Sequence, residues 1–352
     1  MESIAEILRT AKIAGASDVH LTVGIPPKMR VNGDLLSMDY PKVLPPDTEA
    51  VAQEVMNEKQ RAIFDERGEY DMSFAIRDLG RYRVNVFHQR GSIAFAFRLV
   101  GTAIPSPEEL GIPESVIDLS QRKRGLVLVT GPTGSGKSTT LASIINRVNH
   151  TRDAHVITLE DPIEFLHQHD KSMVNQREIG IDSGNYANAL RAALREDPDV
   201  ILVGEMRDFE TISVAITAAE TGHLVLSTLH TIGAASTVDR VIDVFPAHQQ
   251  PQIRIQLSNV LEAIISQQLI PTADGRGRVA AFEVLHANHA VRNLIREGKS
   301  HQLMSVMQTN RKSGMITMDE AIAQLYIAGK ITKDDAIEFA QDVEGMELKL
   351  GR

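Results

Sequence analysis

The stretch RGLVLVTGPTGSGKSTT, Arg124 to Thr140, decides the fold of this chain. Leu126 to Thr130 is a short apolar run rich in β-branched residues, which is typical of a buried parallel strand. Glycines follow at once. Lys137 to Thr139 then open a segment, Leu141 to Val148, whose apolar positions have helical spacing. The stretch therefore predicts a strand, a glycine loop and a helix in direct succession.

The glycine loop satisfies the pattern G-x-x-x-x-G-K-[ST]. Its glycines let backbone N–H groups turn inward toward phosphate oxygens, and the start of the following helix adds a positive partial charge. Lys137 would reach the β- and γ-phosphates, and the Ser138 hydroxyl would bind Mg²⁺. The pattern and its flanking elements predict a nucleoside triphosphate site made of Gly131, Pro132, Thr133, Gly134, Ser135, Gly136, Lys137, Ser138 and Thr139.

The composition excludes several classes of protein. Of the 352 residues, 43% are hydrophobic and 24% are charged, which is ordinary for a globular chain of two or three domains. The formal net charge of −9 argues against general nucleic-acid binding, so no DNA partner is expected. The sequence contains no cysteine, which excludes disulfides and cysteine-based zinc sites. It also shows no signal peptide and no apolar run as long as a membrane span, so we expect a cytoplasmic protein without direct membrane insertion.

The first 100 residues predict an N-terminal α+β domain with a mostly antiparallel sheet. Apolar spacing predicts a helix at 3–15, and a helical region is expected from Asp47 to about Glu66. Alternation predicts strands at 18–23, 28–31, 70–76, 81–89 and 92–99. The turn residues Asn32, Gly33 and Asp34 indicate antiparallel pairing of the segments around them. Residues 101–113 carry three prolines and two glycines, which is typical of a linker.

Beyond the linker, strands alternate with helices, which predicts a parallel α/β core over residues 114–290. The expected strands are 126–130, 154–160, 200–203 and 224–229. The expected helices are 137–148, 185–196, 208–220 and 233–243. After Pro246 the sequence predicts one long helix from Gln249 to about Gln267 and then an extended segment from Arg278 to His286. Residues 291–352 predict a C-terminal subdomain of short helices.

Two acidic clusters follow predicted strands, where an open α/β sheet places its ligand crevice. Glu160, Asp161 and Glu164 come directly after VITL, and carboxylates there can hold Mg²⁺ through water or act as a general base. A solvated acidic turn is the alternative. Glu205 ends the apolar strand DVILVG, at the expected position of a second group that organises Mg²⁺. An aspartate is commoner there, and the alternative is an exposed carboxylate that precedes the cap of the next helix.

Histidines and arginines supply further candidates. Thr228 and His230 lie at a strand tip, from which they could sense a γ-phosphate through hydrogen bonds. His223 taken alone is more simply a structural histidine. The first module contains a set of arginines that are either solvated and ion-paired or that reach a phosphate in a neighbouring subunit: Arg81, Arg83, Arg90 and Arg98.

These clusters, in this order, resemble the secretion and pilus ATPases over nearly the whole chain, and most closely their pilus retraction motors. GPTGSGKST looks like the family's Walker A motif and ITLEDPIE (157–164) like its aspartate box. ILVGEMRD (201–208) resembles its atypical Walker B motif and TGHLVLSTLHT (221–231) its histidine box. SDVHLTVGIPPKMRVNGDL (17–35) is similar to its PAS-like N-terminal module, and VRNLIREGK (291–299) resembles its C-terminal AIRAEG-type element.

The resemblance implies an α/β fold with a RecA-like P-loop ATPase core, an N-terminal PAS-like α+β domain and a C-terminal helical region. It implies Glu164 as catalytic base and Glu205, with Ser138, as the residues that organise Mg²⁺. His223 and His230 would belong to the histidine box. Arginines of the first module, for which we name Arg81 and Arg98, would complete a neighbour's site.

The implied assembly is a homo-hexamer that hydrolyses ATP and powers pilus retraction, the basis of twitching motility. Its partners would be the pilus machinery and a PilC-like platform protein, which would hold the ring at the inner-membrane face. The missing zinc insertion of the extension motors favours the retraction branch, which also includes an accessory ATPase. Two other functions remain possible from the sequence. One is a slow nucleotide-binding switch that regulates assembly, and the other is a DNA-translocating ring, which the net negative charge disfavours.

Overall fold

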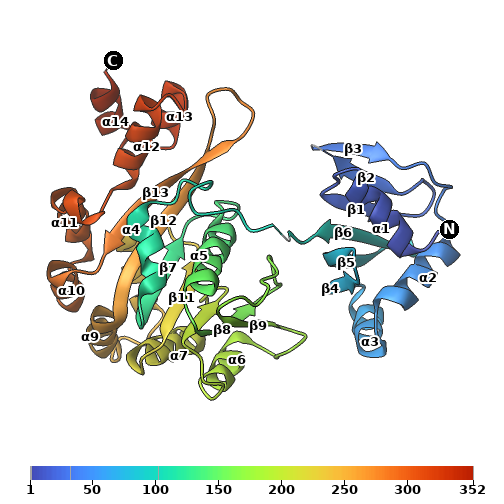
Figure 1. Cartoon of the computed structure of the whole chain (residues 1–352), viewed down its shortest axis with the longest axis horizontal. Coiled ribbons are helices and arrows are strands. Elements are labelled where there is room, and N and C mark those ends of the chain that lie inside the picture. Colours follow the sequence, from blue (N-terminus) through green and yellow to red (C-terminus); the bar gives the residue numbers. More distant parts are fainter. Residues whose placement is uncertain (1, 32, 102, 352) are drawn as a thin grey trace. The chain divides into compact units, whose positions relative to one another are not determined.

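A computed structural model describes residues 2–31, 33–101 and 103–351 (Figure 1). The chain divides into two compact units, of which the first comprises Met1–Thr102 and Glu164–Leu166 and the second Ala103–Ile163 and His167–Arg352. Two residues of the predicted turn and linker, Asn32 and Thr102, lie outside the described residues. None of the helices in the described part is long and apolar enough to cross a membrane.

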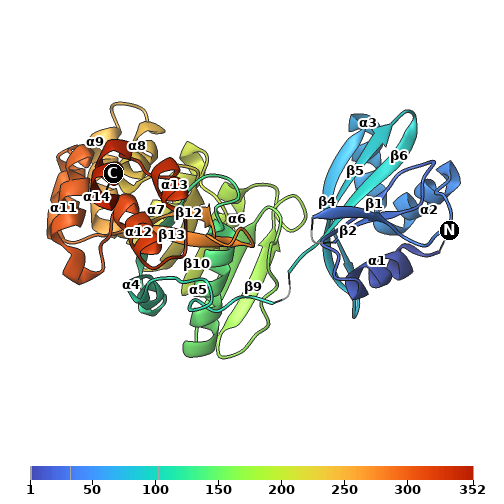
Figure 2. The ribbon, with the colours of Figure 1, turned by 90° about the horizontal axis from the view of Figure 1, so that it is seen from above.

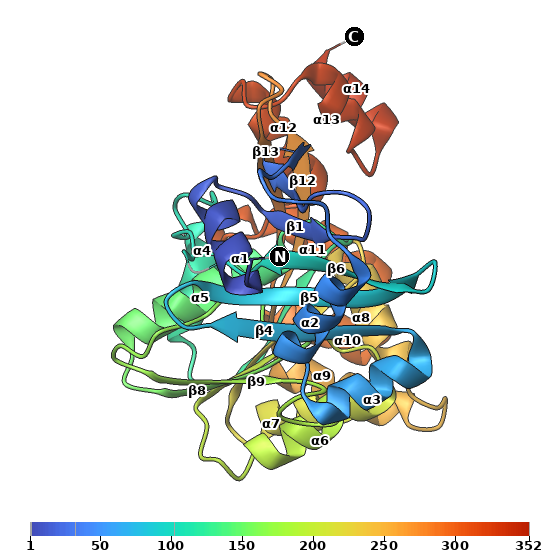
Figure 3. The ribbon, with the colours of Figure 1, turned by 90° about the vertical axis from the view of Figure 1, so that its right-hand side faces the viewer.

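The first unit is built on a six-stranded antiparallel sheet in the order β3-β2-β1-β6-β5-β4. Figure 3 shows β1, β6, β5 and β4 side by side. Helices α1, α2 and α3 pack their apolar side chains on one face, where Phe64, Phe95 and Phe97 are fully buried. The bounds are α1 Ile4–Ile13, β1 Asp18–Leu21, β2 Lys28–Val31, β3 Asp34–Ser37, α2 Pro45–Val55, α3 Glu58–Arg67, β4 Glu69–Ile76, β5 Gly80–Gln89 and β6 Ser92–Leu99.

The helical region expected over 47–66 consists of two helices, α2 and α3. The chain leaves helical geometry at Met56, where φ is −109° and ψ is 136°. Asn57 then caps α3: its side chain accepts a hydrogen bond from the N–H of Gln60, and the Gln60 side chain accepts one from the N–H of Asn57. This reciprocal capping box starts a new helix.

The second unit contains a seven-stranded sheet in the order β13-β12-β7-β11-β10-β8-β9, parallel except for β13. Helices cover both of its faces (Figure 2). Leu126 and Leu128 of β7 pack toward α6–α9, whereas Val127 and Val129 pack toward α4 and α5. The strands are β7 Gly125–Thr130, β8 His155–Glu160, β9 Met173–Glu178, β10 Val200–Val203, β11 Leu224–Leu229, β12 Leu261–Pro271 and β13 Arg278–His286.

The helices of the second unit fall into a set around the sheet and a C-terminal set. The first set is α4 Glu114–Ile117, α5 Lys137–Thr151, α6 Tyr186–Ala193, α7 Phe209–Glu220, α8 Ala234–Asp243, α9 Gln250–Val260, α10 His289–Arg296 and α11 Leu303–Thr309. The second set is α12 Met318–Ile327, α13 Lys333–Glu338 and α14 Val343–Leu350, which pack with Ile270 of β12 and Ala281 of β13 in one apolar cluster. The predicted α/β class is confirmed, because helices lie on both faces of a mainly parallel sheet.

The prediction of a single helix from Gln249 to Gln267 is wrong. Helix α9 ends at Val260, and Leu261 begins β12, which lies between β7 and β13. A continuous apolar run occurs both in central strands and in buried helices, so periodicity alone does not distinguish the two. Strand β9 was also not predicted, since only Val174 and Glu178 of its six residues are buried.

Candidate nucleotide site

The glycine loop between β7 and α5 is shaped by its backbone and by a close neighbour. Gly131 and Gly136 have φ of 141° and 88°, which L-residues rarely adopt. A Cβ on Gly131 would lie 2.3 Å from the carbonyl oxygen of Gln267, and one on Gly136 would lie 2.9 Å from Gln267 Nε2. The β12 backbone therefore leaves no room for a side chain at position 131, and the positive φ favours glycine at position 136.

Lys137 is buried at the start of α5, with 8% of its surface exposed. Its Nζ donates hydrogen bonds to the carbonyl oxygens of Gly131 at 2.8 Å and Pro132 at 3.0 Å. Burial lowers the pKa of Lys137, and the nearby Glu205 carboxylate opposes that shift. The ammonium is thus held over the loop in which it would neutralise phosphate oxygens.

The side chain of Ser135 indicates that a phosphate fits this loop. Its Oγ is buried and has no hydrogen-bond partner among the described residues. An unpaired buried hydroxyl costs free energy, and an anion in the loop would supply the missing acceptor. At the first turn of α5 the Ser138 side chain is exposed, so its hydroxyl is accessible to a cation beside such an anion. These residues fit a bound triphosphate.

Two side chains of β12 support the loop from opposite faces of the sheet. Ser266 Oγ and Thr130 Oγ1 are 2.7 Å apart and share a hydrogen bond. Thr140 Oγ1 donates to Gln267 Oε1 at 2.7 Å. All four side chains are buried. Neither β12 residue was predicted, because one helix was expected from Gln249 to about Gln267, although three polar residues in the apolar run IISQQLI were a visible signal.

We predict that Gln267→Leu destabilises the protein by about 1–3 kcal/mol, because the buried Thr140 hydroxyl loses its acceptor. Urea unfolding measures the loss. The matched variant is Thr140→Val, which removes the donor, and the double variant should cost little more than either single one. Strictly additive losses would contradict the pairing.

Glu205 follows β10 at the carboxyl ends of the parallel strands, the edge at which β7 enters the glycine loop. We call this the P-loop edge. Glu205 is 19% exposed; its Oε1 lies 2.6 Å from Arg207 Nε and its Oε2 lies 3.3 Å from His230 Nε2. Two bonds tie the neighbouring strand tips: Thr228 Oγ1 donates to the Gly204 carbonyl at 2.6 Å, and Met206 N donates to the Thr228 carbonyl. The structure therefore brings Glu205, His230 and Thr228 together.

A magnesium ion would be held here by few protein atoms. The described residues contain no group of three acidic or histidine side chains that could hold a metal by themselves. Mg²⁺ in nucleotide sites usually has one or two protein ligands, with phosphates and water completing the shell. Ser138 and Glu205 at the P-loop edge match that donor set.

Two other predicted residues, His223 and Glu164, are not part of this cluster of strand tips. His223 precedes β11 and so lies at the amino end of that strand, opposite the P-loop edge. Its Nδ1 is 2.9 Å from the Ala218 carbonyl oxygen and 3.3 Å from Thr221 Oγ1. The structure does not bring it to the loop. Glu164 is exposed and groups with the first unit, so its role as base stays a prediction.

The arginines Arg81 and Arg98 lie on β5 and β6 of the first unit. Arg98 Nε donates to Asp18 Oδ1 at 2.7 Å, and its side chain is otherwise largely exposed. Partial burial by itself would raise the pKa of Asp18. Hydrogen bonds from Ser17 and Arg98 outweigh that effect, so the pKa lies below its usual value. The strand register places Arg83 opposite Arg98, with Arg81 two residues before Arg83 on the same face.

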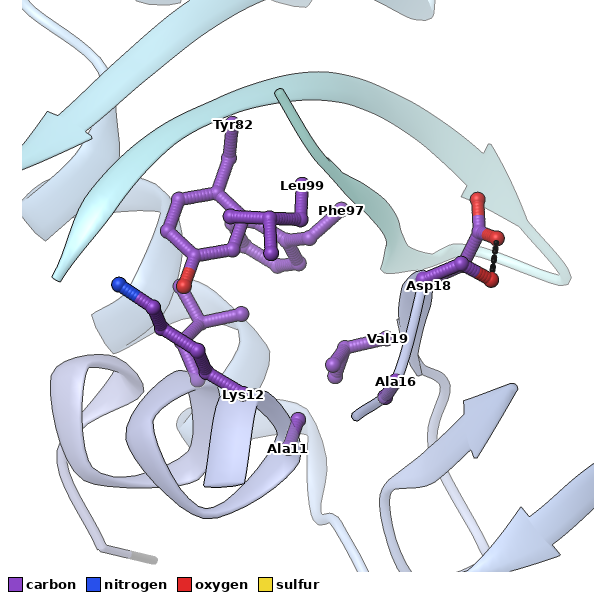
Figure 4. A pocket seen from close by; sticks show the side chains of 10 residues that line it. Ala11, Lys12, Ala16, Asp18, Val19, Tyr82, Phe97 and Leu99 are labelled. Carbon is purple, nitrogen blue, oxygen red and sulfur yellow. Dashed lines mark hydrogen bonds between the residues drawn. The ribbon is translucent and has the colours of Figure 1, made fainter. Parts of the chain in front are cut away.

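Beside Asp18 the first unit contains a cavity of about 10 Å³ (Figure 4). Figure 4 shows Tyr82, Phe97, Leu99 and Lys12 around it. The Tyr82 hydroxyl is buried and has no hydrogen-bond partner among the described residues, and burial raises the pKa of Tyr82 to about 12. The volume suffices for one water molecule at most, so this cavity is no ligand site.

This protein is a P-loop nucleoside triphosphatase with a RecA-like core. Its class is defined by the parallel sheet, by the glycine loop with the buried Lys137, and by Glu205 just after the end of β10. The chain belongs to the Type II/IV secretion system protein family, whose model matches residues 2–338.

Relatives and a solved structure are similar over nearly the whole chain. The Twitching motility protein of Neisseria gonorrhoeae is 50% identical over 346 residues, 98% of this chain and 92% of that protein. The Type IV pilus retractation ATPase PilT of Pseudomonas aeruginosa is 48% identical over 338 residues, 96% of this chain and 98% of that protein. The crystal structure of the pilus retraction motor PilT with bound ADP has a TM-score of 0.93 and 52% identity, and the match covers 99% of this chain and 100% of that one. The predicted resemblance to pilus retraction motors is confirmed.

Proposed function

We propose that this protein is a Mg²⁺-dependent ATPase that powers type IV pilus retraction. The observation that carries the proposal is the P-loop edge, where the buried Lys137 and the Glu205 carboxylate lie beside a loop that fits a triphosphate. The similarity to a motor solved with bound ADP supports adenine nucleotide as the substrate. The similarity to a pilus retraction ATPase and to a twitching motility protein supports the biological role.

Phosphoryl transfer to water needs positioning and charge neutralisation more than covalent chemistry. The loop N–H groups and Lys137 would bind the phosphates. Ser138 and Glu205 would hold Mg²⁺, which would supply positive charge to neutralise the phosphate oxygens. Glu164 orients the attacking water and accepts its proton. His230 is bonded to Glu205 and so lies where the loss of a γ-phosphate alters its surroundings.

The working unit is a homo-hexameric ring. Arg81 and Arg98 lie on one antiparallel sheet, from which they reach the nucleotide of a neighbouring subunit as arginine fingers. The state of the γ-phosphate then biases the arrangement of the two units, and that bias produces movement. The ring acts in the cytoplasm at the inner-membrane face, where a platform protein of the PilC kind connects it to the pilus machinery.

Two alternative functions can be distinguished from a retraction motor by experiment. A slow nucleotide-binding switch would keep its biological output when hydrolysis is abolished, whereas a motor would lose it. A DNA-translocating ring would bind DNA with a steep salt dependence, which the net charge of −9 disfavours. No observation on this chain favours an accessory ATPase of the PilU kind over the retraction motor itself.

The test is ATP turnover of the full chain, measured on size-separated oligomers with and without Mg²⁺. We expect turnover to accompany the ring fraction and to disappear when Mg²⁺ is chelated. Equal turnover by monomers would contradict the trans arginines, and turnover that survives chelation would contradict the metal assignment.

A further inference from the structure

Glu283 is a buried carboxylate that the catalytic scheme does not use. It lies near the middle of β13 and is only 1% exposed. Its register partner on β12 is Ser266, whose own partner on β7 is Thr130, the last residue before the glycine loop. Thr130, Ser266 and Glu283 therefore form one row across three strands, which we call the polar row.

The polar row holds the start of α8 through two hydrogen bonds. Gly233 N donates to Ser266 Oγ at 3.1 Å, and Ala234 N donates to Glu283 Oε1 at 2.8 Å. Ser266 also bonds Thr130. The segment that begins α8 is thus tied to the strand that carries the glycine loop. His230, which contacts Glu205, lies three residues before Gly233.

The other oxygen of Glu283 holds a second helix. Met318 N donates to Glu283 Oε2 at 3.2 Å, at the start of α12. Helix α12 packs with α13 and α14 in the C-terminal apolar cluster. One side chain therefore connects the helix after His230 with the C-terminal helices.

Neither helix has a cap of its own that would make this carboxylate redundant. Gly233 at the cap position of α8 has no side chain, and Thr317 at that of α12 makes no capping hydrogen bond. A buried carboxylate is costly unless it is well hydrogen-bonded. Two helix starts supply N–H donors and positive partial charge. Burial raises the pKa of Glu283, and the bonds from Ala234 and Met318 oppose that shift.

We propose that Glu283 is a positioning residue of the nucleotide site: by capping α8 and α12 with one carboxylate, it fixes the His230 segment against the glycine-loop strand and couples that segment to the C-terminal helices. This inference rests on the proposed ATPase function. Glu283 belongs neither to the glycine loop nor to the segment that carries Glu205 and His230, so it acts through the helix start that it caps.

The test uses Glu283→Gln in the full chain, because the amide keeps the shape but its NH₂ group cannot accept from a backbone N–H. We expect kcat to fall about 10- to 100-fold, since small displacements of catalytic groups have effects of that size. The affinity for ATP should stay within about threefold, because Lys137 and the loop are unchanged. Amide hydrogen exchange at the starts of both α8 and α12 should become faster.

The control is Thr332→Ala, which removes the capping bond of α13 from the same C-terminal cluster. This variant should lower the melting temperature, because a helix cap is lost, and should leave kcat unchanged. If Glu283→Gln lost stability but kept wild-type kcat at a temperature where it is fully folded, Glu283 would be only a structural cap and the proposal would be overturned. Faster exchange at one helix start alone would overturn the coupling.

Hydrogen exchange also separates this inference from the proposed function. A wild-type chain that bound ATP without turning it over would overturn the ATPase assignment. Loss of protection at both helix starts in Glu283→Gln would still support the double cap, and unchanged protection at both would overturn it.

Discussion

Lys137→Ala is expected to lower kcat/KM for ATP hydrolysis by about 10³-fold or more, because a preorganised charge on the transferring phosphoryl group has effects of that order. The side chain is buried against the loop, where its Nζ bonds the Gly131 and Pro132 carbonyls. No neighbouring lysine on the loop can replace it. Steady-state hydrolysis should show the fall in kcat/KM, and equilibrium binding should show a lower affinity for ATP.

The matched control is Lys123→Ala, which removes an exposed lysine just before β7. It should leave turnover unchanged. Thermal unfolding of Lys137→Ala separates a catalytic loss from a folding loss, since the two carbonyl oxygens that Lys137 bonds can accept from water. A folded Lys137→Ala chain with normal turnover would rule out the P-loop edge as the site of hydrolysis.

Glu164→Gln is expected to lower kcat by about 10²- to 10⁴-fold, the range that a general base contributes, while ATP binding survives. The amide keeps the size of the side chain but cannot accept a proton from water. Single-turnover hydrolysis should fall with kcat, and the affinity for ATP should change little, because the phosphate-binding groups belong to the glycine loop.

Glu108→Gln serves as the control, because Glu108 is an exposed glutamate outside both acidic clusters. Equal turnover by Glu164→Gln and wild type would exclude Glu164 as the base. The base would then have to be sought among Glu160 and Asp161 of the same acidic cluster.

The glycine loop could be predicted because its chemistry is local in sequence. A strand, six residues of loop and a helix must follow one another for backbone N–H groups to converge on a phosphate. Glu205 and His230 could be predicted for a related reason. Each lies within two residues of the end of a strand, β10 or β11, and parallel strands of one sheet end at the same edge.

The prediction was wrong where burial hides the period of the chain. In Leu261–Pro271 the apolar residues face both sides of the sheet, so neither the strand nor the helix period stands out. The helix expected there concealed Ser266 and Gln267, the two side chains that support the glycine loop. His223 shows the reverse case: it is close in sequence to His230 but lies at the other end of β11.

The sequence alone determined that this chain has a phosphate-binding loop, an α/β core, an acidic strand tip and membership in a family of pilus and secretion ATPases. Each of these follows from residues that are neighbours in sequence. Only the tertiary structure decided that β12 lies beside β7, that the Gln267 carbonyl leaves room only for glycine at position 131, and that Glu283 caps two helices at once. Those contacts join residues that are distant in sequence, and their partners are set by strand order and register, which no local pattern of residues specifies.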